Sequence, residues 1–410
     1  MCGCTTITSA KNSVLPIAAA AVMLDGETVI HKCPDLLDVR VSADIINSLD
    51  CSAIMQNGNF SVLYKESDIC TIPEDLCSKM RSSILYMAPL LYRKGKAEIC
   101  WPGGCNIGKR QIDIHLDGLK CMGAQVECVE NKIIVTAPQG LRGTQFRLRL
   151  PSVGATQTLI MAASTAKGIT VLHNCAREPE VVDLVRFLKD AGAKITGAGK
   201  GEIIIQGVPA LSGVEYTPIA DRILAATVLS AVNACRGAVY MKNYPAAYMS
   251  AFEKLLKPTG LKIYHLANGT LALKTFDRAV DIKTHTGYYP AFSTDMGPLL
   301  SSSLVNNNGT LLLRENIFEN RFSYSHEFEK MGLNCRTDSR DYFQTAGKEI
   351  FSAHLKAEDL RAGAALVVAA LAKRGSFTIE GVEYIDRGYE KIENIFSSLG
   401  GNIRRETFEQ

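Results

Sequence analysis

The sequence predicts an α/β protein of two domains, each built from three copies of one unit that mixes strands with two helices. Two observations lead to this prediction. A small-residue apolar segment that ends at a glycine recurs six times, and a second glycine-terminated segment lies between its copies. The copies are spaced by roughly 70 residues, which is longer than the repeat of common solenoids. Six such units in 410 residues therefore favour two domains of three units over one extended array.

The first marker is typical of a helix followed by a strand. A glycine that ends a helix adopts a left-handed backbone without steric cost, and β-branched residues after it favour a strand. We expect each copy to place its glycine at the helix end. The copies are AAAAVMLDGETVI, LLYRKGKAEI, AASTAKGITVL, AVNACRGAVYM, LVNNNGTLLL and AALAKRGSFTI, with Gly26, Gly95, Gly168, Gly237, Gly309 and Gly375.

The second marker indicates a second helix, a glycine stop and another strand. A weaker sixth copy, INSLDCSAI, has Asp50 in place of the glycine. The break between the third and fourth units is expected near residues 216–221. The five clear copies are LKCMGAQV, FLKDAGAKI, LKPTGLKI, FEKMGLNC and FSSLGGNI, with Gly123, Gly192, Gly260, Gly332 and Gly400.

Composition excludes several classes of protein. The hydrophobic content of 47% and charged content of 21% are typical of a globular protein with a core. The net charge of +3 gives no reason to expect a nucleic-acid partner. The longest apolar run, residues 13–24, is too short to span a membrane and lacks a cleavage pattern, so neither membrane insertion nor a signal peptide is expected.

The 13 cysteines indicate a reducing compartment, and therefore a cytoplasmic location. They are odd in number, spread over the chain and without CxxC pairs, so neither a disulfide framework nor a metal site is predicted. Most of them are expected to be small buried apolar residues.

Polar residues gather where the small-residue helices are predicted to start. Serine, threonine, aspartate and asparagine there are ordinary capping residues. Cations oppose the helix dipole, however, unless an anion binds at the same place. Lys11, Arg81, Arg222 and Arg361 therefore point to a site for a polyanion, with solvated surface charge as the alternative. The helix starts are SAKN (9–12), KMRSS (79–83), PSVGAT (151–156), ADRI (220–223), STDM (293–296) and EDLRAG (358–363).

Three further segments place an arginine among acidic or aromatic neighbours. They are CAREPE (175–180), FENRF (318–322) and DRGYE (386–390). Each by itself is explained by a structural ion pair.

Taken together, the motifs resemble the UDP-N-acetylglucosamine 1-carboxyvinyltransferase family of enolpyruvyl transferases, which opens peptidoglycan synthesis. The motifs follow the order of that family over nearly the whole chain, and the sister 3-phosphoshikimate 1-carboxyvinyltransferases lack this set. The residues that carry the resemblance are PGGCNIGKRQID, SAKN, MRSS, PSVGAT, AREPE, DRI, FSTDM, FENRF, DLRAGAAL and IDRGYE.

The resemblance implies a fold of two inside-out α/β barrels, each with threefold pseudosymmetry, which agrees with the six repeats. Residues 12–219 are expected to form one domain. Residues 1–11 and 220–410 are expected to form the other, with the active-site cleft between the two.

The implied reaction joins phosphoenolpyruvate to the 3-hydroxyl of UDP-N-acetylglucosamine and releases phosphate, by addition and elimination through a tetrahedral ketal. These two substrates are the expected partners. No cofactor, metal or protein partner is implied.

By resemblance, Cys105 is the acid that protonates carbon 3 of the enol. Neighbouring Lys109 and Arg110 are cations of the kind that favour a thiolate, and the glycines around them suit a mobile loop. The alternative is a structural thiol in a glycine turn. We expect the phosphoenolpyruvate-like epoxide fosfomycin to alkylate Cys105. Asp295 resembles the base for the sugar hydroxyl, and this role is compatible with helix capping.

The resemblance also implies the substrate contacts. Several cations are needed to hold the phosphate and carboxylate of phosphoenolpyruvate, whereas bare amides at a helix start suit a diphosphate. Asp113 is expected to accept hydrogen bonds from the uracil edge. Glu178 and Arg321 match residues that line the cleft. The cations matched to phosphoenolpyruvate are Lys11, Arg110, Arg361 and Arg387, with Lys11 and Arg387 also catalytic. Asn12 matches a polar contact next to Lys11, and Arg81 matches a cleft arginine near the substrates. The nucleotide set is Arg110, Gln111, Ile112, Asp113, Ile114, Ser152, Val153, Gly154 and Ile317.

The chain departs from the family at several positions. Ser9 replaces a usual glycine, Gln111 a proline, Leu224 a glutamate and Gly297 a glutamine. The family also has a longer N-terminal segment that forms a strand, so a sheet edge is expected to be open here.

Two alternatives follow from these departures. One is a catalytically impaired paralogue that binds UDP-N-acetylglucosamine as a sensor or scaffold. The other is enolpyruvyl transfer to a different acceptor, such as shikimate 3-phosphate.

Overall fold

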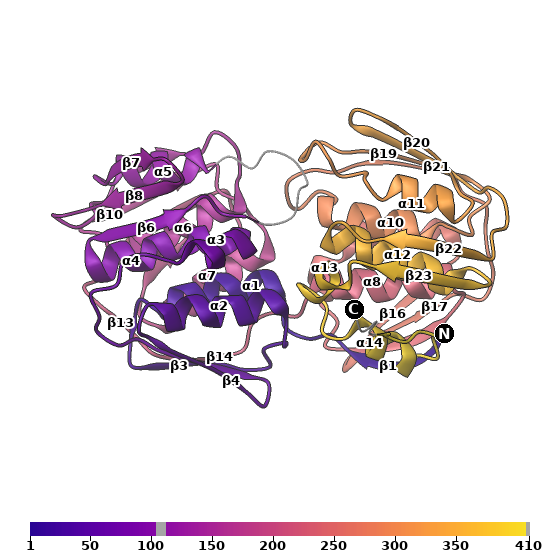
Figure 1. Ribbon diagram of the computed structural model, residues 1–410, viewed down its shortest axis with the longest axis horizontal. Helices are drawn as coiled ribbons and strands as arrows, with labels where there is room; N and C mark the ends of the chain where they lie inside the picture. Colours follow the sequence, from indigo (N-terminus) through magenta and orange to yellow (C-terminus); the bar gives the residue numbers. More distant parts are fainter. Residues whose placement is uncertain (104–111, 407–410) are drawn as a thin grey trace. The chain divides into compact units, whose positions relative to one another are not determined.

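The computed structural model describes residues 1–103 and 112–406. Its contacts divide the chain into two compact units (Figure 1). The described part of the first unit is residues 9–103 and 112–219, and that of the second is residues 1–8 and 220–406. The first unit begins at Ser9, earlier than the expected boundary after Lys11. The backbone N–H of Ala10 donates to the carbonyl of Ile219 at 2.8 Å, which ties residues 9–11 to the first unit.

Three sheets of the first unit repeat one pattern. A segment from elsewhere in the chain pairs in parallel with the strand after a central helix, and an antiparallel hairpin completes the sheet. In one sheet a bridge from Thr71 to Glu98 replaces the parallel strand. The sheet orders are β14 (Glu215–Tyr216), β3 (Glu27–Ile30), β5 (Asn59–Leu63), β4 (Ser52–Gln56); β6 (Lys96–Cys100), β8 (Lys132–Thr136), β7 (Gln125–Val129); β9 (Gln145–Arg147), β10 (Ile169–His173), β12 (Glu202–Gln206), β11 (Lys194–Thr196); and the short pair β2 (Leu24–Asp25), β13 (Leu211–Ser212).

The second unit repeats the pattern twice in full. Its third sheet keeps only the parallel pair, and in the described residues no strand follows Gly400, so the sixth copy is shorter than predicted. The sheet orders are β1 (Cys2–Thr6), β15 (Ala238–Lys242), β17 (Gly269–Leu273), β16 (Lys262–Leu266); β18 (Ile282–His285), β19 (Thr310–Arg314), β21 (Asp341–Thr345), β20 (Asn334–Asp338); and β22 (Ser352–Lys356), β23 (Ser376–Glu380).

The small-residue helices form the centre of each unit, and the sheets lie outside them (Figure 1). In the second unit α8, α10 and α12 contact one another. All residues of α8 and α10 are buried, because small side chains allow helices to pack closely. The central helices are α1 (Lys11–Ala21), the 3₁₀ helix η1 (Arg81–Tyr86) with α4 (Met87–Lys94), and α6 (Val153–Ser164); then α8 (Arg222–Ala234), η4 (Thr294–Met296) with α10 (Gly297–Ser303), and α12 (Leu360–Ala372).

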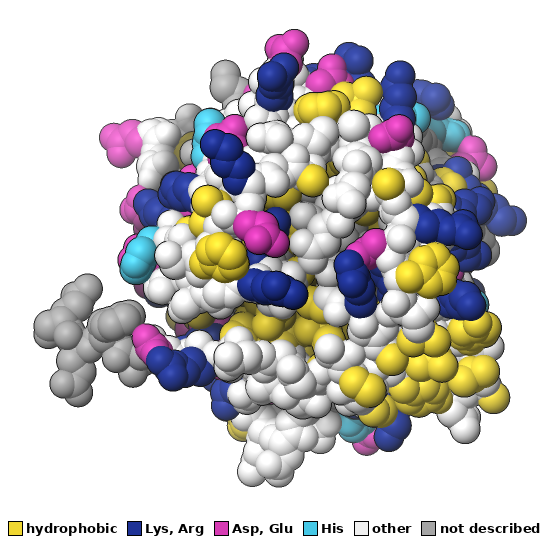
Figure 2. Space-filling model, turned by 90° about the vertical axis from the view of Figure 1, so that its right-hand side faces the viewer, with side chains coloured by type: hydrophobic (Ala, Val, Ile, Leu, Met, Phe, Trp, Pro, Cys, Tyr) yellow, Lys and Arg dark blue, Asp and Glu magenta, His cyan; other side chains and the backbone are white. Residues whose placement is uncertain are grey.

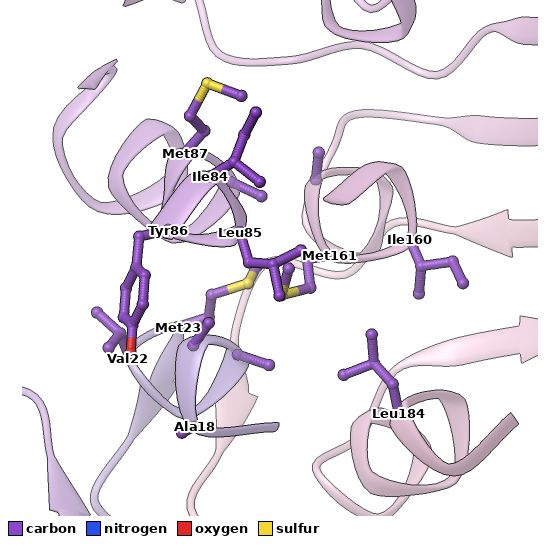
Figure 3. Packing of buried hydrophobic residues seen from close by; sticks show 14 of the residues in the cluster. Ala18, Val22, Met23, Ile84, Leu85, Tyr86, Met87, Ile160, Met161 and Leu184 are labelled. Atoms are coloured by element: carbon purple, nitrogen blue, oxygen red, sulfur yellow. The ribbon is translucent and has the colours of Figure 1, made fainter. Parts of the chain in front are cut away.

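Figure 3 shows the core of the first unit, where these helices meet. Leu85 of η1, Met161 of α6 and Met23 after α1 converge, and Tyr86 lies beside Val22. All five side chains are buried at 3% exposure or less. The central helices are therefore held together by the packing of apolar side chains near their C-terminal ends.

A second helix follows each of these central helices, as the second marker predicts. The second helices are α2 (Leu37–Ser48), α5 (Asp113–Cys121), α7 (Pro179–Asp190), α9 (Ser250–Leu256), α11 (Ser325–Lys330) and α14 (Ile392–Ser398). Short additional helices are α3 (Glu74–Lys79), α13 (Val382–Asp386), η2 (Ala246–Tyr248) and η3 (Lys257–Thr259).

The two glycine markers have different outcomes. All five second-marker glycines have left-handed φ, and Asp50 takes the same conformation at φ 60°. The first-marker prediction is wrong in detail. Only Gly95 caps its helix, at φ 66°, whereas the other glycines lie just before the strand. Gly309 is not left-handed, and a Cβ there would lie 2.1 Å from the carbonyl oxygen of Val280. Close approach of two backbones therefore explains that glycine.

The N-terminal strand that was expected to be missing is present, and it is the outer strand of its sheet. Cys2–Thr6 forms β1, which pairs in parallel with β15, and the backbone N–H of Cys2 donates to the carbonyl of Leu399 at 2.8 Å. Ser9 is buried and is not in the left-handed region, so serine is accommodated where glycine is usual.

The described cysteines form no disulfide, but only half of them are buried. The expectation that most cysteines are buried is therefore met only in part. The buried ones are Cys33, Cys51, Cys77, Cys100, Cys175 and Cys335.

The face of the second unit drawn in Figure 2 mixes cationic and acidic side chains, with apolar side chains gathered toward the lower right. This intermixing agrees with the small net charge of +3. Over residues 1–103 and 112–406, no helix has both the length and the apolar character needed to cross a membrane.

Candidate active site

In the second unit, one carboxylate is paired with two guanidinium groups. Asp295 lies in η4, directly before α10, and Arg361 lies in the first turn of α12. Arg321 follows the FEN residues after β19. Arg321 Nη2 lies 2.7 Å from Asp295 Oδ1, and Arg361 Nη2 lies 3.2 Å from Asp295 Oδ2. The fold thus brings together three residues that the sequence analysis selected separately.

A second carboxylate extends this cluster. Asp359 caps α12, and its Oδ1 accepts from the backbone N–H groups of Arg361 at 2.8 Å and Ala362 at 3.0 Å. The same oxygen lies 3.9 Å from Arg321 Nη1. The side chain of Asp295 is 25% exposed, against 2% for Arg321 and 6% for Asp359. Asp295 is therefore the member of this cluster that is best placed to meet a substrate.

Arg361 stays charged although it is buried. Burial by itself lowers its pKa, but the carboxylate of Asp295, followed by Tyr389 and Asp221, raises it above the ordinary arginine value. Burial raises the pKa of Tyr389, so its hydroxyl stays protonated and pairs with Thr227 Oγ1 at 2.8 Å. The cation is thus held by groups from α8, η4 and the segment after α13.

Glu315 organises the loop that contains Ile317, and the sequence analysis missed it. This residue is 1% exposed. Its carboxylate accepts from Thr286 Oγ1 and Thr294 Oγ1, each at 2.8 Å, and from the backbone N–H of Ile317 at 2.7 Å. Because Thr294 precedes Asp295, Glu315 ties the Ile317 loop to the turn that holds the carboxylate. The sequence signal that could have identified Glu315 is an acidic residue directly after the strand segment LLLR.

Arg387 ends α13 and is half-buried. It stands two residues before Tyr389, which interacts with Arg361. The DRGYE motif therefore supplies Tyr389 to the Arg361 region.

In the first unit, Lys11 begins α1 and pairs with Asp38 in the first turn of α2. The distance from Lys11 Nζ to Asp38 Oδ2 is 2.8 Å, and the two side chains are 11% and 6% exposed. Asn12 is partly exposed next to them. The sequence analysis missed Asp38, which stands 27 residues from its partner and carries no motif.

The nucleotide motifs converge at the start of α6. Ser152 caps this helix by accepting from the backbone N–H of Ala155 at 3.4 Å. A Cβ on Gly154 would lie 3.1 Å from His115 Cε1, so glycine at this position leaves room for the imidazole ring. Asp113 begins α5 and pairs with Arg149.

His115 links these residues and was also missed. Its Nδ1 lies 3.0 Å from Thr158 Oγ1 on α6. Burial, reinforced by the charge of Arg81 and opposed by that of Asp113, lowers the pKa of His115 to about 3. The imidazole is therefore neutral near pH 7, and the same interactions locate Arg81 and Asp113 near the start of α6.

The predicted site residues divide between the units. Cys105, Arg110 and Gln111 lie outside the described residues. Ile112 and Ile114 are 3% and 5% exposed and belong to the hydrophobic core, and Leu224 is buried in α8. The first unit contains Lys11, Asn12, Arg81, Ile112, Asp113, Ile114, Ser152, Val153 and Gly154; the second contains Asp295, Ile317, Arg361 and Arg387.

Comparisons with known proteins extend over nearly the whole chain. The sequence model of EPSP synthase (3-phosphoshikimate 1-carboxyvinyltransferase) matches residues 3–396. A UDP-N-acetylglucosamine 1-carboxyvinyltransferase 2 from Caldanaerobacter subterraneus subsp. tengcongensis is 40% identical over 97% of this chain and 95% of its own. A protein of the same name from Clostridium tetani is 39% identical over 97% of this chain and 96% of its own.

Solved structures show the same fold. The enolpyruvyl transferase NikO from Streptomyces tendae gives a TM-score of 0.86 at 24% identity, covering 98% of this chain and 95% of that one. EPSP synthase from Acinetobacter baumannii gives a TM-score of 0.74 at 16% identity, covering 97% and 95%.

Proposed function

The chain belongs to the enolpyruvyl transferase family, and from this premise we propose that it transfers the enolpyruvyl group of phosphoenolpyruvate to the 3-hydroxyl of UDP-N-acetylglucosamine. Phosphate is the second product, and the step is the first committed one of peptidoglycan synthesis. The fold expected from the resemblance is confirmed by the structural relatives. The observation that carries the proposal is the partly exposed carboxylate of Asp295, held by Arg321 and Arg361, in a chain 40% identical to proteins named for this reaction.

The proposed addition step uses two proton-transfer groups. Asp295 takes the proton of the 3-hydroxyl as that oxygen bonds to carbon 2 of phosphoenolpyruvate. Cys105 gives its thiol proton to carbon 3, and a tetrahedral ketal results. In the elimination step the thiolate removes a proton from carbon 3, the double bond re-forms, and phosphate departs with the C–O electron pair and the proton held by Asp295.

Four cations are proposed to hold the phosphate and carboxylate of phosphoenolpyruvate: Lys11, Arg110, Arg361 and Arg387. Two anionic groups need several donors, and the planar guanidinium fork fits both. The position of Lys11 supports this role, since its ammonium lies at the start of α1, 2.8 Å from Asp38 Oδ2. Asn12 is proposed as a polar contact beside Lys11.

The diphosphate of the UDP sugar is assigned to the start of α6, where Ser152, Val153 and Gly154 present backbone amides. Asp113 is proposed to accept a hydrogen bond from the uracil, and Arg81 to add positive charge near the diphosphate. The start of α6 supports this assignment because Ser152 caps the helix there and the neighbouring residue 154 is a glycine. Further nucleotide contacts are assigned to Arg110, Gln111, Ile112, Ile114 and Ile317.

Neither alternative is favoured. A sensor paralogue would not require the ion-paired Asp295, and several relatives at 39–40% identity are named as transferases. Those relatives are named for the UDP sugar rather than for shikimate 3-phosphate. The cytoplasmic location remains a prediction.

Phosphate release tests the proposal most directly. Phosphoenolpyruvate is supplied with and without UDP-N-acetylglucosamine, and Cys105→Ser is compared with the exposed control Cys128→Ser. We expect release only with both substrates, a strong loss in Cys105→Ser and none in the control. Release without the sugar, or equal rates in both variants, would contradict the proposal.

Fosfomycin provides an independent chemical test. We expect intact-mass analysis to find one adduct, which peptide mapping places on Cys105. An adduct on Cys128 instead would remove the assignment of Cys105 as the reactive thiol.

A further inference from the structure

We propose that Arg321 is the positioning residue for Asp295, and that Arg361 is shared between Asp295 and the anionic substrate. In this arrangement phosphoenolpyruvate draws Arg361 away and leaves one carboxylate oxygen ready to act as the base. The inference rests on the proposed function, because it requires Asp295 to take the proton of the sugar hydroxyl.

Arg321 is built into the turn that carries Asp295. Its Nη2 donates to Asp295 Oδ1 at 2.7 Å, and its Nε donates to the carbonyl of Thr294 at 3.4 Å. Arg321 therefore donates hydrogen bonds to two consecutive residues of η4, Thr294 and Asp295. Nη1 lies 3.9 Å from Asp359, which caps α12. The side chain of Arg321 is 2% exposed and is engaged by Asp295, Thr294 and Asp359.

Arg361 makes the longer of the two contacts to Asp295. Its Nη2 lies 3.2 Å from Oδ2, and Tyr389 interacts with the same guanidinium. Phosphoenolpyruvate carries a phosphate and a carboxylate, which compete for this cation in the proposed site. The guanidinium has five N–H donors, so substrate first engages those not directed at Asp295, and the longer contact to Oδ2 yields as the group turns toward the substrate anions.

The exchange has a chemical consequence at Asp295. With Arg361 engaged by substrate, Oδ2 accepts the hydroxyl proton while Arg321 keeps Oδ1 and the plane of the carboxylate fixed. The O–H bond of the sugar breaks as its oxygen bonds to carbon 2 of the enol. Without Arg321 the carboxylate is free to rotate and to follow Arg361. Removing Arg321 therefore disturbs the chemical step more than the binding of phosphoenolpyruvate.

Steady-state phosphate release by Arg321→Met and Arg321→Lys tests this role. We expect Arg321→Met to lower kcat on the order of 10- to 100-fold, since small misplacements of a reacting group have effects of this size. The KM for phosphoenolpyruvate should change far less. The acidic limb of the kcat–pH profile should move to higher pH, because a cation beside the base is lost. Arg321→Lys keeps the charge but not the fork, so its effects should be intermediate.

Arg314 on β19 provides a matched control. It is an arginine 59% exposed in its side chain and 3.9 Å from Asp341. Arg314→Met and Arg314→Lys should leave kcat and its pH profile unchanged. A second control uses Asp295→Asn. Adding Arg321→Met to that variant should cause no further loss of the residual rate, since Arg321 acts through Asp295.

Two outcomes overturn the inference. One is an unmoved acidic limb in folded Arg321→Met, with any loss of rate matched by a loss of thermal stability. The other is a further fall in the residual rate when Arg321→Met is added to Asp295→Asn. If Arg321→Met does not fold, the same double-mutant comparison with Arg321→Lys decides. A wild-type chain that releases no phosphate refutes the proposed function, whereas an active wild type with unaffected Arg321 variants refutes only this inference.

Discussion

The two units organise their charged residues in different ways. In the first unit the Lys11–Asp38 pair joins α1 to α2, and the neutral His115 interacts with the charges of Arg81 and Asp113, the latter paired with Arg149. In the second unit Asp295, Arg321, Arg361 and Asp359 form one continuous network. Substitutions within the network of the second unit should therefore be non-additive.

The caps of the central helices explain part of this difference. In the second unit, α8 and α12 start with the acidic caps Asp221 and Asp359, and each is followed within two residues by an arginine. In the first unit, α1 has no side-chain cap, and the partner of Lys11 comes from α2. Neighbouring acid and base groups at one helix start build a network more readily than partners from different helices.

Substitution of Asp295 should have the largest effect. Asp295→Asn keeps the size of the side chain but cannot take a proton, so kcat should fall about 10²- to 10⁴-fold. Phosphate release with both substrates measures the loss. The exposed carboxylate of Asp341 offers a control, and Asp341→Asn should be within about twofold of the wild type in rate. A loss in Asp295→Asn smaller than tenfold would mean that another group is the base.

Breaking the buried pair of the first unit should mainly affect stability. Asp38→Asn removes the carboxylate that lies 2.8 Å from the Lys11 ammonium, and should lower the free energy of unfolding by about 3–5 kcal/mol. Urea unfolding measures this change. Asp35→Asn, which breaks the exposed pair with Arg40, should cost about 1 kcal/mol or less. Equal costs for the two variants would show that the burial of Lys11 and Asp38 has no energetic role.

His115 should make the first unit sensitive to acid. Its pKa is about 3 in the folded state, below the ordinary value of 6.5, so below pH 6.5 the unfolded state binds a proton that the folded state does not. This contribution to stability is present above pH 6.5 and is lost at about 1.4 kcal/mol per pH unit as pH falls toward the folded pKa. His115→Gln should therefore lose less stability than the wild type between pH 7 and pH 5, as followed by thermal unfolding. Parallel pH dependences would contradict the prediction.

The smallest effect is expected at Ser9, where the chain passes from the second unit to the first. The hydrogen bond from its hydroxyl to Pro218 is long, at 3.5 Å, and the backbone is outside the left-handed region. Ser9→Gly should therefore change the free energy of unfolding by about 1 kcal/mol or less. A larger loss in chemical denaturation would show that the serine has a structural role at this junction.

Local sequence signals predicted the fold well where one residue sets the backbone. The second-marker glycines and Asp50 all have left-handed φ, because this conformation depends on sterics within a single turn. The first marker was less accurate, since the six glycines share a sequence context but not a conformation. Gly309 is explained by the approach of Val280, which lies in a different part of the sequence.

The sequence by itself determined the family, the repeats and the types of residue at the helix starts, because these depend on short motifs and local periodicity. Tertiary structure alone decided the partners. Asp38 reaches Lys11 across 27 positions, and Asp295 meets Arg321 and Arg361 across 26 and 66. These pairings depend on how the central helices pack against each other, and short sequence motifs do not determine that packing. The chemical groups can thus be found in the sequence, but which cation orients which carboxylate is settled only when the helix starts are brought together.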